Sequence, residues 1–93
     1  MARESSIEKK CRLYVESKGG WLKKWVSPGN VGVPDRICCL LGGHVLFFEF
    51  KRPGKGLSDI QIEVISEMRT MGCKVYVVDN VLDFKKIIEE KLK

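Results

Sequence analysis

The chain of 93 residues has room for one domain and excludes a second, and its 44% hydrophobic and 31% charged residues are typical of a soluble globular protein. Its net charge of +5 favours polyanionic partners over acidic or neutral small substrates. When Lys and Arg bind a phosphate backbone they release its condensed counterions, and this release favours binding. Charge that only keeps the protein soluble is the alternative explanation.

The first predicted element is an amphipathic helix over residues 6–18, because its apolar residues recur at i, i+4, i+7 and i+8. Ser5 followed by Glu8 three residues later fits a capping box, and Gly19 with Gly20 ends the helix. The apolar positions of this helix are Ile7, Cys11, Tyr14 and Val15.

A strand over residues 21–26 follows, because Trp21 and Trp25 are strong β-formers. We expect both tryptophans in the core or in an interface, and stacking on a nucleic-acid base is the alternative. Lys23 and Lys24 interrupt the apolar residues of this strand.

Residues 35–41 and 44–51 are predicted to form a hairpin around Gly42 and Gly43. The run over residues 45–48 is apolar without alternation, which predicts a strand covered on both faces.

The second half of the chain predicts a helix over residues 59–71, a short buried strand over residues 75–78 and a last helix from about residue 81. Ser58 caps the second helix and Gly72 ends it. The element order α-β-β-β-α-β-α predicts an α/β fold with a mixed β-sheet flanked by helices. The inward-facing positions of the two helices are Ile60, Val64, Ile65 and Met68, and then Phe84, Ile87, Ile88 and Leu92.

The cysteines and the single histidine do not indicate zinc. No two cysteines form a Cys-x-x-Cys pair, and His44 is the only histidine. Because the sequence shows no signal peptide and no long apolar span, we expect reduced thiols in a cytoplasmic protein. The four cysteines are Cys11, Cys38, Cys39 and Cys73.

Three charged residues sit at one end of the predicted hairpin: Asp35, Glu49 and Lys51. Charges in an apolar setting are costly unless they bind one another, a metal or a substrate. Two neighbouring carboxylates repel each other unless a cation lies between them, and oxygen ligands suit Mg²⁺ or Mn²⁺. The backbone carbonyl of Phe50 is a candidate third ligand.

Lys51 is expected to lie beside the metal rather than on it. Its ammonium would orient or help to deprotonate an attacking water and offset charge in the transition state. A metal, a water and a lysine together suit hydrolysis of a phosphodiester. A mutual surface ion pair of Glu49 and Lys51 is the alternative interpretation.

The proposed site requires a hairpin register that places Asp35 opposite Glu49. A two-residue turn at Gly42 and Gly43 would pair Asp35 with Phe50 instead of Glu49. We therefore predict a three-residue turn, a bulge, or an Asp35 that lies just ahead of the regular strand.

At these residues the chain resembles the VRR-NUC domain, a family of the PD-(D/E)xK nuclease superfamily with a restriction-endonuclease-like core. The resemblance covers most of the chain, from Ile7 to about Asp83, so we expect a single VRR-NUC-like domain over residues 1–93. It is carried by the element order and by three segments: Gly32-Val33-Pro34-Asp35-Arg36, Glu49-Phe50-Lys51 and Leu57-Ser58-Asp59-Ile60-Gln61.

The resemblance implies a role for each matched residue. Asp35 and Glu49 match the metal-binding acids, Lys51 the catalytic lysine, and Gln61 the helix glutamine that faces the active site. Glu8 matches an acid on the first helix that completes the metal environment, directly or from outside it. Capping of their own helices is the alternative for Glu8 and Gln61, since both stand three residues after a serine.

The resemblance also implies a metal-dependent DNA endonuclease like the small standalone members of bacteria and phages, which resemble dimeric Holliday-junction resolvases. We therefore expect branched DNA as the substrate, a homodimer, and a location in the bacterial or host cytoplasm. The alternatives are a non-catalytic DNA-binding module on the same scaffold and a structural domain. The candidate phosphate contacts are Lys9, Lys10, Lys23, Lys24, Arg52 and Lys55.

Overall fold

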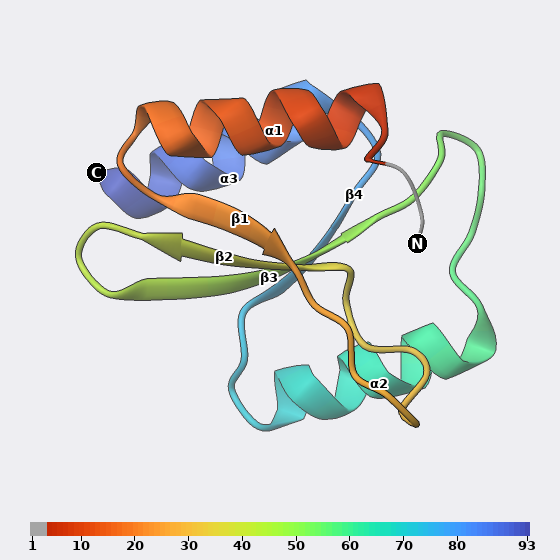
Figure 1. The fold of residues 1–93 in the computed structure, drawn as a ribbon. Coiled ribbons are helices and arrows are strands. Elements are labelled where there is room, and N and C mark those ends of the chain that lie inside the picture. Colours follow the sequence, from red (N-terminus) through yellow and green to blue (C-terminus); the bar gives the residue numbers. More distant parts are fainter. Residues whose placement is uncertain (1–3) are drawn as a thin grey trace.

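The structure is a computed structural model that describes residues 4–93. Its elements follow the predicted order α-β-β-β-α-β-α (Figure 1). The bounds are α1 Ser6–Ser17, β1 Trp21–Lys24, β2 Arg36–Leu40, β3 His44–Phe50, α2 Asp59–Thr70, β4 Val75–Val78 and α3 Val81–Leu92.

The four strands form one mixed sheet in the order β1-β2-β3-β4, in which β1, β2 and β3 are antiparallel neighbours and β4 is parallel to β3. Helices α1 and α3 lie side by side on one face of this sheet, and α2 lies on the other (Figure 1). Because a parallel pair needs a crossover connection, α2 links β3 to β4 across the second face. The predicted α/β fold, a mixed sheet flanked by helices, is confirmed.

Local sequence signals account for the helix ends. In α1, the backbone N–H of Glu8 donates to Ser5 Oγ at 3.1 Å, and Glu8 Oε2 accepts from the backbone N–H of Ser5 at 3.2 Å. Two donors that helix geometry leaves free are thereby satisfied. The helix ends at Ser17, one residue before the predicted end, and Gly19 has a positive φ of 85°.

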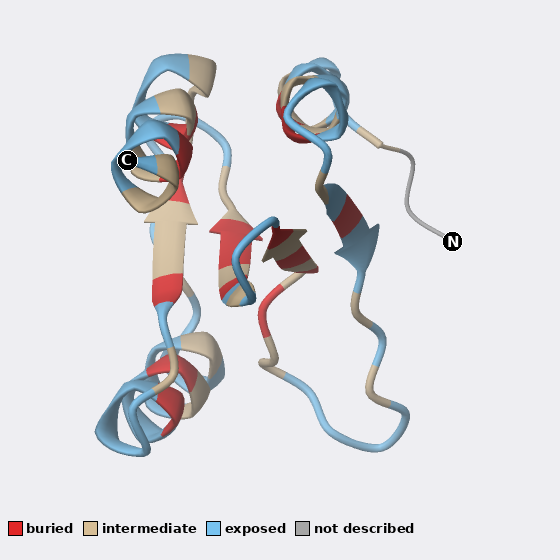
Figure 2. Cartoon of the chain, turned by 90° about the vertical axis from the view of Figure 1, so that its left-hand side faces the viewer, coloured by how far each residue is buried: buried red, intermediate tan, exposed pale blue. Residues whose placement is uncertain are grey.

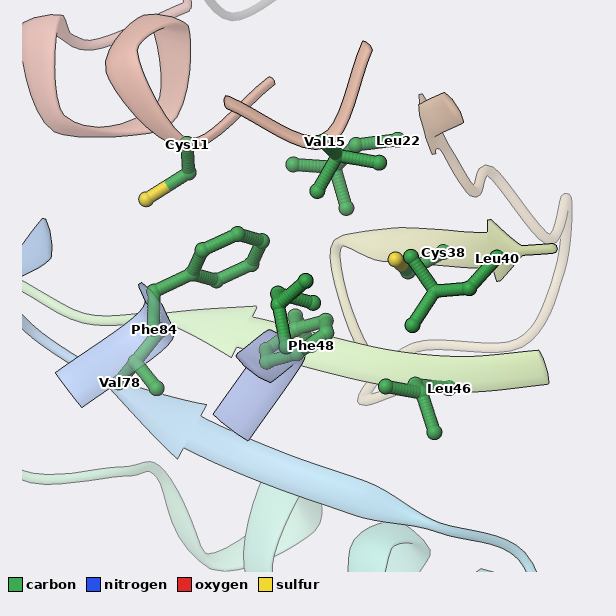
Figure 3. Packing of buried hydrophobic residues seen from close by; sticks show 10 residues of the cluster. Cys11, Val15, Leu22, Cys38, Leu40, Leu46, Phe48, Val78 and Phe84 are labelled. Carbon is green, nitrogen blue, oxygen red and sulfur yellow. The ribbon is translucent and has the colours of Figure 1, made fainter. Parts of the chain in front are cut away.

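The main hydrophobic core lies between the sheet and the pair α1 and α3. Figure 3 shows Cys11 and Val15 of α1 on the side of the sheet on which Phe84 of α3 and Phe48 of β3 lie together. A smaller core lies between the sheet and α2, where Ile65 and its buried neighbours pack. In Figure 2 the buried residues accordingly concentrate along the inner sides of the helices and on the two central strands. The fully covered face therefore belongs to α1 and α3.

The structure differs from the sequence-based predictions at one strand end and at two apolar side chains. Strand β1 ends at Lys24 instead of residue 26, and Val45 of β3 is 49% exposed. On α2, Ile60 is 41% exposed although it lies on the predicted stripe. Helix α2 has only 12 residues, which leaves part of the second face of the sheet, including Val45, open to solvent.

All four cysteines, which lie in the described part of the chain, are free thiols. Burial raises the pKa of the Cys11 and Cys38 thiols to about 12, so both behave as core residues. Among residues 4–93, no helix is long and apolar enough to cross a membrane.

Candidate active site

The register of the hairpin brings Asp35 opposite Glu49. Strands β2 and β3 pair Arg36 with Phe48 and Leu40 with His44, which leaves a turn of three residues, 41–43. Continued by one residue, the same register sets Asp35, just ahead of β2, across from Glu49. The predicted irregularity is thus present as a three-residue turn, in which Gly42 and Gly43 supply positive φ values of 91° and 82°.

The loop before Asp35 is held against α2 by a close approach at Gly32. A Cβ atom at Gly32 would lie 2.9 Å from the carbonyl oxygen of Ile60, and the φ of Gly32 is +92°. Any larger residue would therefore push the loop away from the helix. The carbonyl of Asp35 accepts from the backbone N–H of Trp25 at 2.8 Å, which ties the other side of the loop to the end of β1.

Asp35 is half-buried and oriented by the backbone of β3. The N–H of Phe50 donates to Asp35 Oδ2 at 2.9 Å. This bond lowers the pKa of Asp35, but burial outweighs it and raises the pKa above the ordinary value. The neighbouring carboxylate of Glu8 raises it further, and Arg36 acts in the opposite direction.

Glu49 is the most deeply buried acid of the site, with 4% of its surface exposed. Its Oε2 accepts from Gln61 Nε2 at 3.1 Å, whereas its Oε1 is buried and has no hydrogen-bond partner within residues 4–93. Burial and the adjacent Asp35 raise the pKa of Glu49 to about 8. Burial and the neighbouring Asp35 thus both disfavour the charged form of Glu49.

Gln61 makes hydrogen bonds both to the cap of its own helix and to Glu49. Its Oε1 accepts from the backbone N–H of Ser58 at 2.9 Å and completes the capping box of α2. Its Nε2 donates to Glu49 at 3.1 Å. Because one amide has both an acceptor and donors, the capping interpretation and the site interpretation are compatible.

Lys51 follows Glu49 at the end of β3 and is partly exposed. Its backbone N–H donates to the carbonyl of Val78 at 3.0 Å, which fixes the main chain against β4. Its ammonium donates to the carbonyl of Lys55 at 3.2 Å, so the side chain rests on the glycine-containing loop that follows. The structure thus places Lys51 at the same end of the sheet as the two acids, with its charge turned to the loop.

Glu8 lies close enough to raise the pKa of both acids, but its oxygens are engaged elsewhere. Its Oε1 accepts from Arg36 Nε at 3.3 Å, and its Oε2 accepts from the N–H of Ser5. The structure therefore brings Glu8 beside the pair while the capping box and an arginine hold it.

Arg36 is the residue of this site that sequence reasoning left without a role. It is 2% exposed and reaches three acceptors on the face opposite Asp35: Glu8, the carbonyl of Leu22 at 3.3 Å, and Glu4 Oε2 at 3.0 Å. Successive side chains of a strand point to opposite faces, so the sequence could have predicted that Arg36 lies on the face opposite Asp35.

The donor set fits a divalent cation bound by few protein ligands. Among residues 4–93 there is no group of three or more His, Cys, Asp or Glu side chains that could hold a metal ion. The buried, unpartnered Oε1 of Glu49 beside a second carboxylate is nevertheless an acceptor without a positive charge. A small, hard cation such as Mg²⁺ keeps several waters and needs only one or two carboxylates.

The predicted phosphate contacts are all exposed, and they lie on three elements. Arg52 and Lys55 lie on the loop directly after Lys51, while the pairs at residues 9–10 and 23–24 lie on α1 and β1. Lys23 Nζ lies 5.3 Å from the ring centroid of Trp21, and that tryptophan is 40% exposed. Trp25 instead packs on Phe47, with 5.5 Å between ring centroids, as expected of a core residue.

Comparison with known proteins points to one family. No family model matches the chain. A protein named "Putative nuclease p44" from Acyrthosiphon pisum secondary endosymbiont phage 1 is 39% identical over 80 residues, which are 86% of this chain and 86% of that protein. A solved structure described as a VRR_NUC domain superposes with a TM-score of 0.84 and 27% identity, covering 96% of this chain and 97% of the other. By this similarity in sequence and fold, the chain belongs to the VRR-NUC family of nucleases.

Proposed function

We propose that the protein is a DNA endonuclease that needs Mg²⁺ or Mn²⁺ to hydrolyse phosphodiester bonds. The observation that carries this proposal is the buried Oε1 of Glu49, which has no partner within residues 4–93 and lies beside a second carboxylate, Asp35. A protein that only binds DNA has no use for two coupled acids near phosphate. A cation between them removes both the repulsion and the missing interaction.

In this proposal Asp35, Glu49 and the carbonyl of Phe50 hold the metal. When bound, the cation supplies a Lewis acid that polarises the phosphodiester. The N–H of Phe50 orients Asp35, and the Gln61 amide orients Glu49. Glu8, held by Arg36, stays close to the site and adds negative charge around the cation.

Lys51 acts beside the metal. Its ammonium leaves the Lys55 carbonyl, where it is held by a single hydrogen bond, and turns to the attacked phosphate. There it orients the attacking water and offsets the negative charge that develops in the transition state. Arg52 and Lys55 follow within the same loop and contact the flanking phosphates, and the exposed lysines of α1 and β1 extend this contact.

Branched DNA is the proposed substrate, and a homodimer is the proposed active form. A four-way junction has two-fold symmetry, which a symmetric dimer can match by placing its two active sites on two symmetry-related strands. A chain of this length also has a small core, so a partner subunit would add buried surface. The proposed location is the cytoplasm of a bacterium or of a phage-infected host.

Cleavage assays on a panel of labelled DNAs test the proposal. A four-way junction, a flap and a plain duplex are incubated with Mg²⁺, Mn²⁺ or EDTA. We expect cleavage of the branched DNAs with either metal, none in EDTA, and at least ~100-fold less in Asp35→Ala or Lys51→Ala. Glu67→Ala and Lys86→Ala, at exposed helix positions, are the matched controls and should keep full activity.

Three outcomes would change the conclusion. Full activity of a correctly folded Asp35→Ala or Lys51→Ala variant would overturn the mechanism. DNA binding that EDTA does not affect, without cleavage under any divalent cation, would instead support the non-catalytic binding module. Sedimentation of the protein as a monomer at micromolar concentration would exclude the dimer.

A further inference from the structure

A small pocket lies at the end of β3, next to the proposed active site. Its volume is about 110 Å³. Two of its residues belong to the N-terminal end of α1, and the others belong to the segment in which β3 ends and the next loop begins. The pocket therefore lies between α1 and the residues that directly follow Glu49. It is lined by Ser5, Ile7, Phe50, Lys51, Arg52 and Pro53.

Phe50 links this pocket to the carboxylate pair. Its backbone N–H donates to Asp35 Oδ2 at 2.9 Å. Successive strand side chains point to opposite faces, so the ring of Phe50 leaves the face of Glu49 and lies on the side of α1 and α3, where its centroid is 5.8 Å from that of Phe84. The backbone of Phe50 thus contacts the site, and the same residue lines the pocket.

The size and lining of the pocket suit a small ligand that has an apolar part and an anionic part. The volume of about 110 Å³ lies far below the ~300 Å³ at which pockets for whole small molecules begin. Ile7, Phe50 and Pro53 are the apolar residues of the lining, and Lys51 and Arg52 are its basic residues. An aromatic residue and an arginine together suit a nucleobase with its phosphate.

We propose that this pocket binds an unpaired nucleobase next to the scissile phosphate. The proposal rests on the proposed nuclease function. A base inside an intact duplex is paired and stacked, and removing it costs free energy, whereas a base at a branch point is already partly released. Occupation of the pocket would therefore make the enzyme prefer branched DNA over duplex, with Lys51 holding the phosphate of the same nucleotide.

The test compares two DNAs that differ by one base. Each is a branched DNA with an unpaired nucleotide at the branch, on either flank in turn, and in the second DNA this nucleotide is abasic. Affinity of the full chain is measured by fluorescence anisotropy in EDTA, so that no cleavage occurs. We expect the abasic DNA to bind about 10-fold more weakly, as the loss of one stacked base predicts.

Two variants of α1 assign this difference to the pocket. Ile7→Phe places a larger side chain in the pocket and should bind both DNAs with the same, weaker affinity. Leu13→Phe adds the same ring at a position of this helix that is 48% exposed, and it should keep the 10-fold difference. Pro53→Ala removes one wall at an exposed loop position and should reduce the difference, even where Ile7→Phe does not fold.

Every outcome separates the pocket from the nuclease. Equal affinity of the unmodified protein for the two DNAs on both flanks would overturn the pocket and leave the proposed nuclease standing. An unchanged difference in Pro53→Ala and in folded Ile7→Phe would also overturn it. A protein that shows the 10-fold difference in EDTA but cleaves no DNA with Mg²⁺ or Mn²⁺ would retain the pocket and lose the nuclease.

Discussion

The side-chain amide of Gln61 joins the cap of α2 to the carboxylate of Glu49, accepting from the Ser58 N–H at 2.9 Å and donating to Glu49 Oε2 at 3.1 Å. The start of a helix is thereby tied to an acid at the end of the central strand β3. Since the amide is held at both ends, the orientation of Glu49 depends on the local structure of α2.

The two bonds of Gln61 can be separated by mutation. Gln61→Ala should lower the cleavage rate roughly 10- to 100-fold, because Glu49 loses the partner that orients it. Ser58→Ala removes the cap and leaves the Glu49 contact, so it should cost about 1 kcal/mol of stability and little activity. Cleavage rates and urea unfolding of both variants check this, and equal loss of activity in the two would show that Gln61 acts only as a cap.

The raised pKa of Glu49 predicts a stability that falls with pH. Because the fold raises this pKa from 4.5 to about 8, the folded state favours the protonated acid. Its contribution is complete below pH 4.5 and is lost as the pH rises through 8. In metal-free buffer the wild-type protein should therefore lose on the order of a few kcal/mol between pH 5 and pH 9.

Glu49→Gln is the matched variant for this pH dependence. Its neutral amide cannot titrate, so urea unfolding should show a smaller loss of stability between the same two pH values. It should also be more stable than the wild type at pH 9 and inactive in cleavage. An identical pH profile for the two proteins would show that Glu49 is not the titrating group.

Metal binding should stabilise the protein more strongly at high pH. The cation competes with the proton on Glu49, whose pKa is about 8, and with the proton on Asp35, whose pKa is also raised. A metal concentration of 100 times Kd would stabilise the fold by about 2.7 kcal/mol. We expect the rise in melting temperature with Mg²⁺ or Mn²⁺ to be larger at pH 8.5 than at pH 6.

Asp35→Asn provides the control for the metal effect. It removes one of the two carboxylates and should abolish the metal-dependent rise in melting temperature, while Glu67→Gln at an exposed position should retain it. A rise of the same size in Asp35→Asn would place the cation elsewhere on the chain.

Arg36 should be among the most important polar residues for stability. Its guanidinium is 2% exposed and bonds to Glu8, Glu4 and the Leu22 carbonyl. Arg36→Met would leave Glu8 without its cation, at an expected cost of about 3–5 kcal/mol. Arg12→Met loses bonds to Glu4 and Glu16 at a side chain that is 30% exposed, and should cost less than about 1 kcal/mol. Chemical unfolding of both variants gives the comparison, and similar losses would contradict the assigned burial.

The elements and their caps followed from local patterns. The period of apolar residues and the serine caps at Ser5 and Ser58 predicted the helices to within about a residue, because both signals act between neighbours in the chain. The segments around Asp35 and Glu49, between Gly32 and Lys51, carried the motif from which these two acids were predicted as metal ligands. No local pattern in the chain distinguished capping from a site role for Gln61.

Contacts between segments far apart in the chain determined the strand register and the geometry of the site. The turn over residues 41–43 shifts the register so that Asp35 faces Glu49, and only pairing with β3 selects that register. The second bond of Gln61 and the burial of Arg36 likewise depend on surfaces that meet after folding. The sequence alone therefore determined which residues could form a metal site. Only the tertiary structure decided their pairing, their raised pKa values and the pocket beside them, because burial and distance arise between segments far apart in the chain.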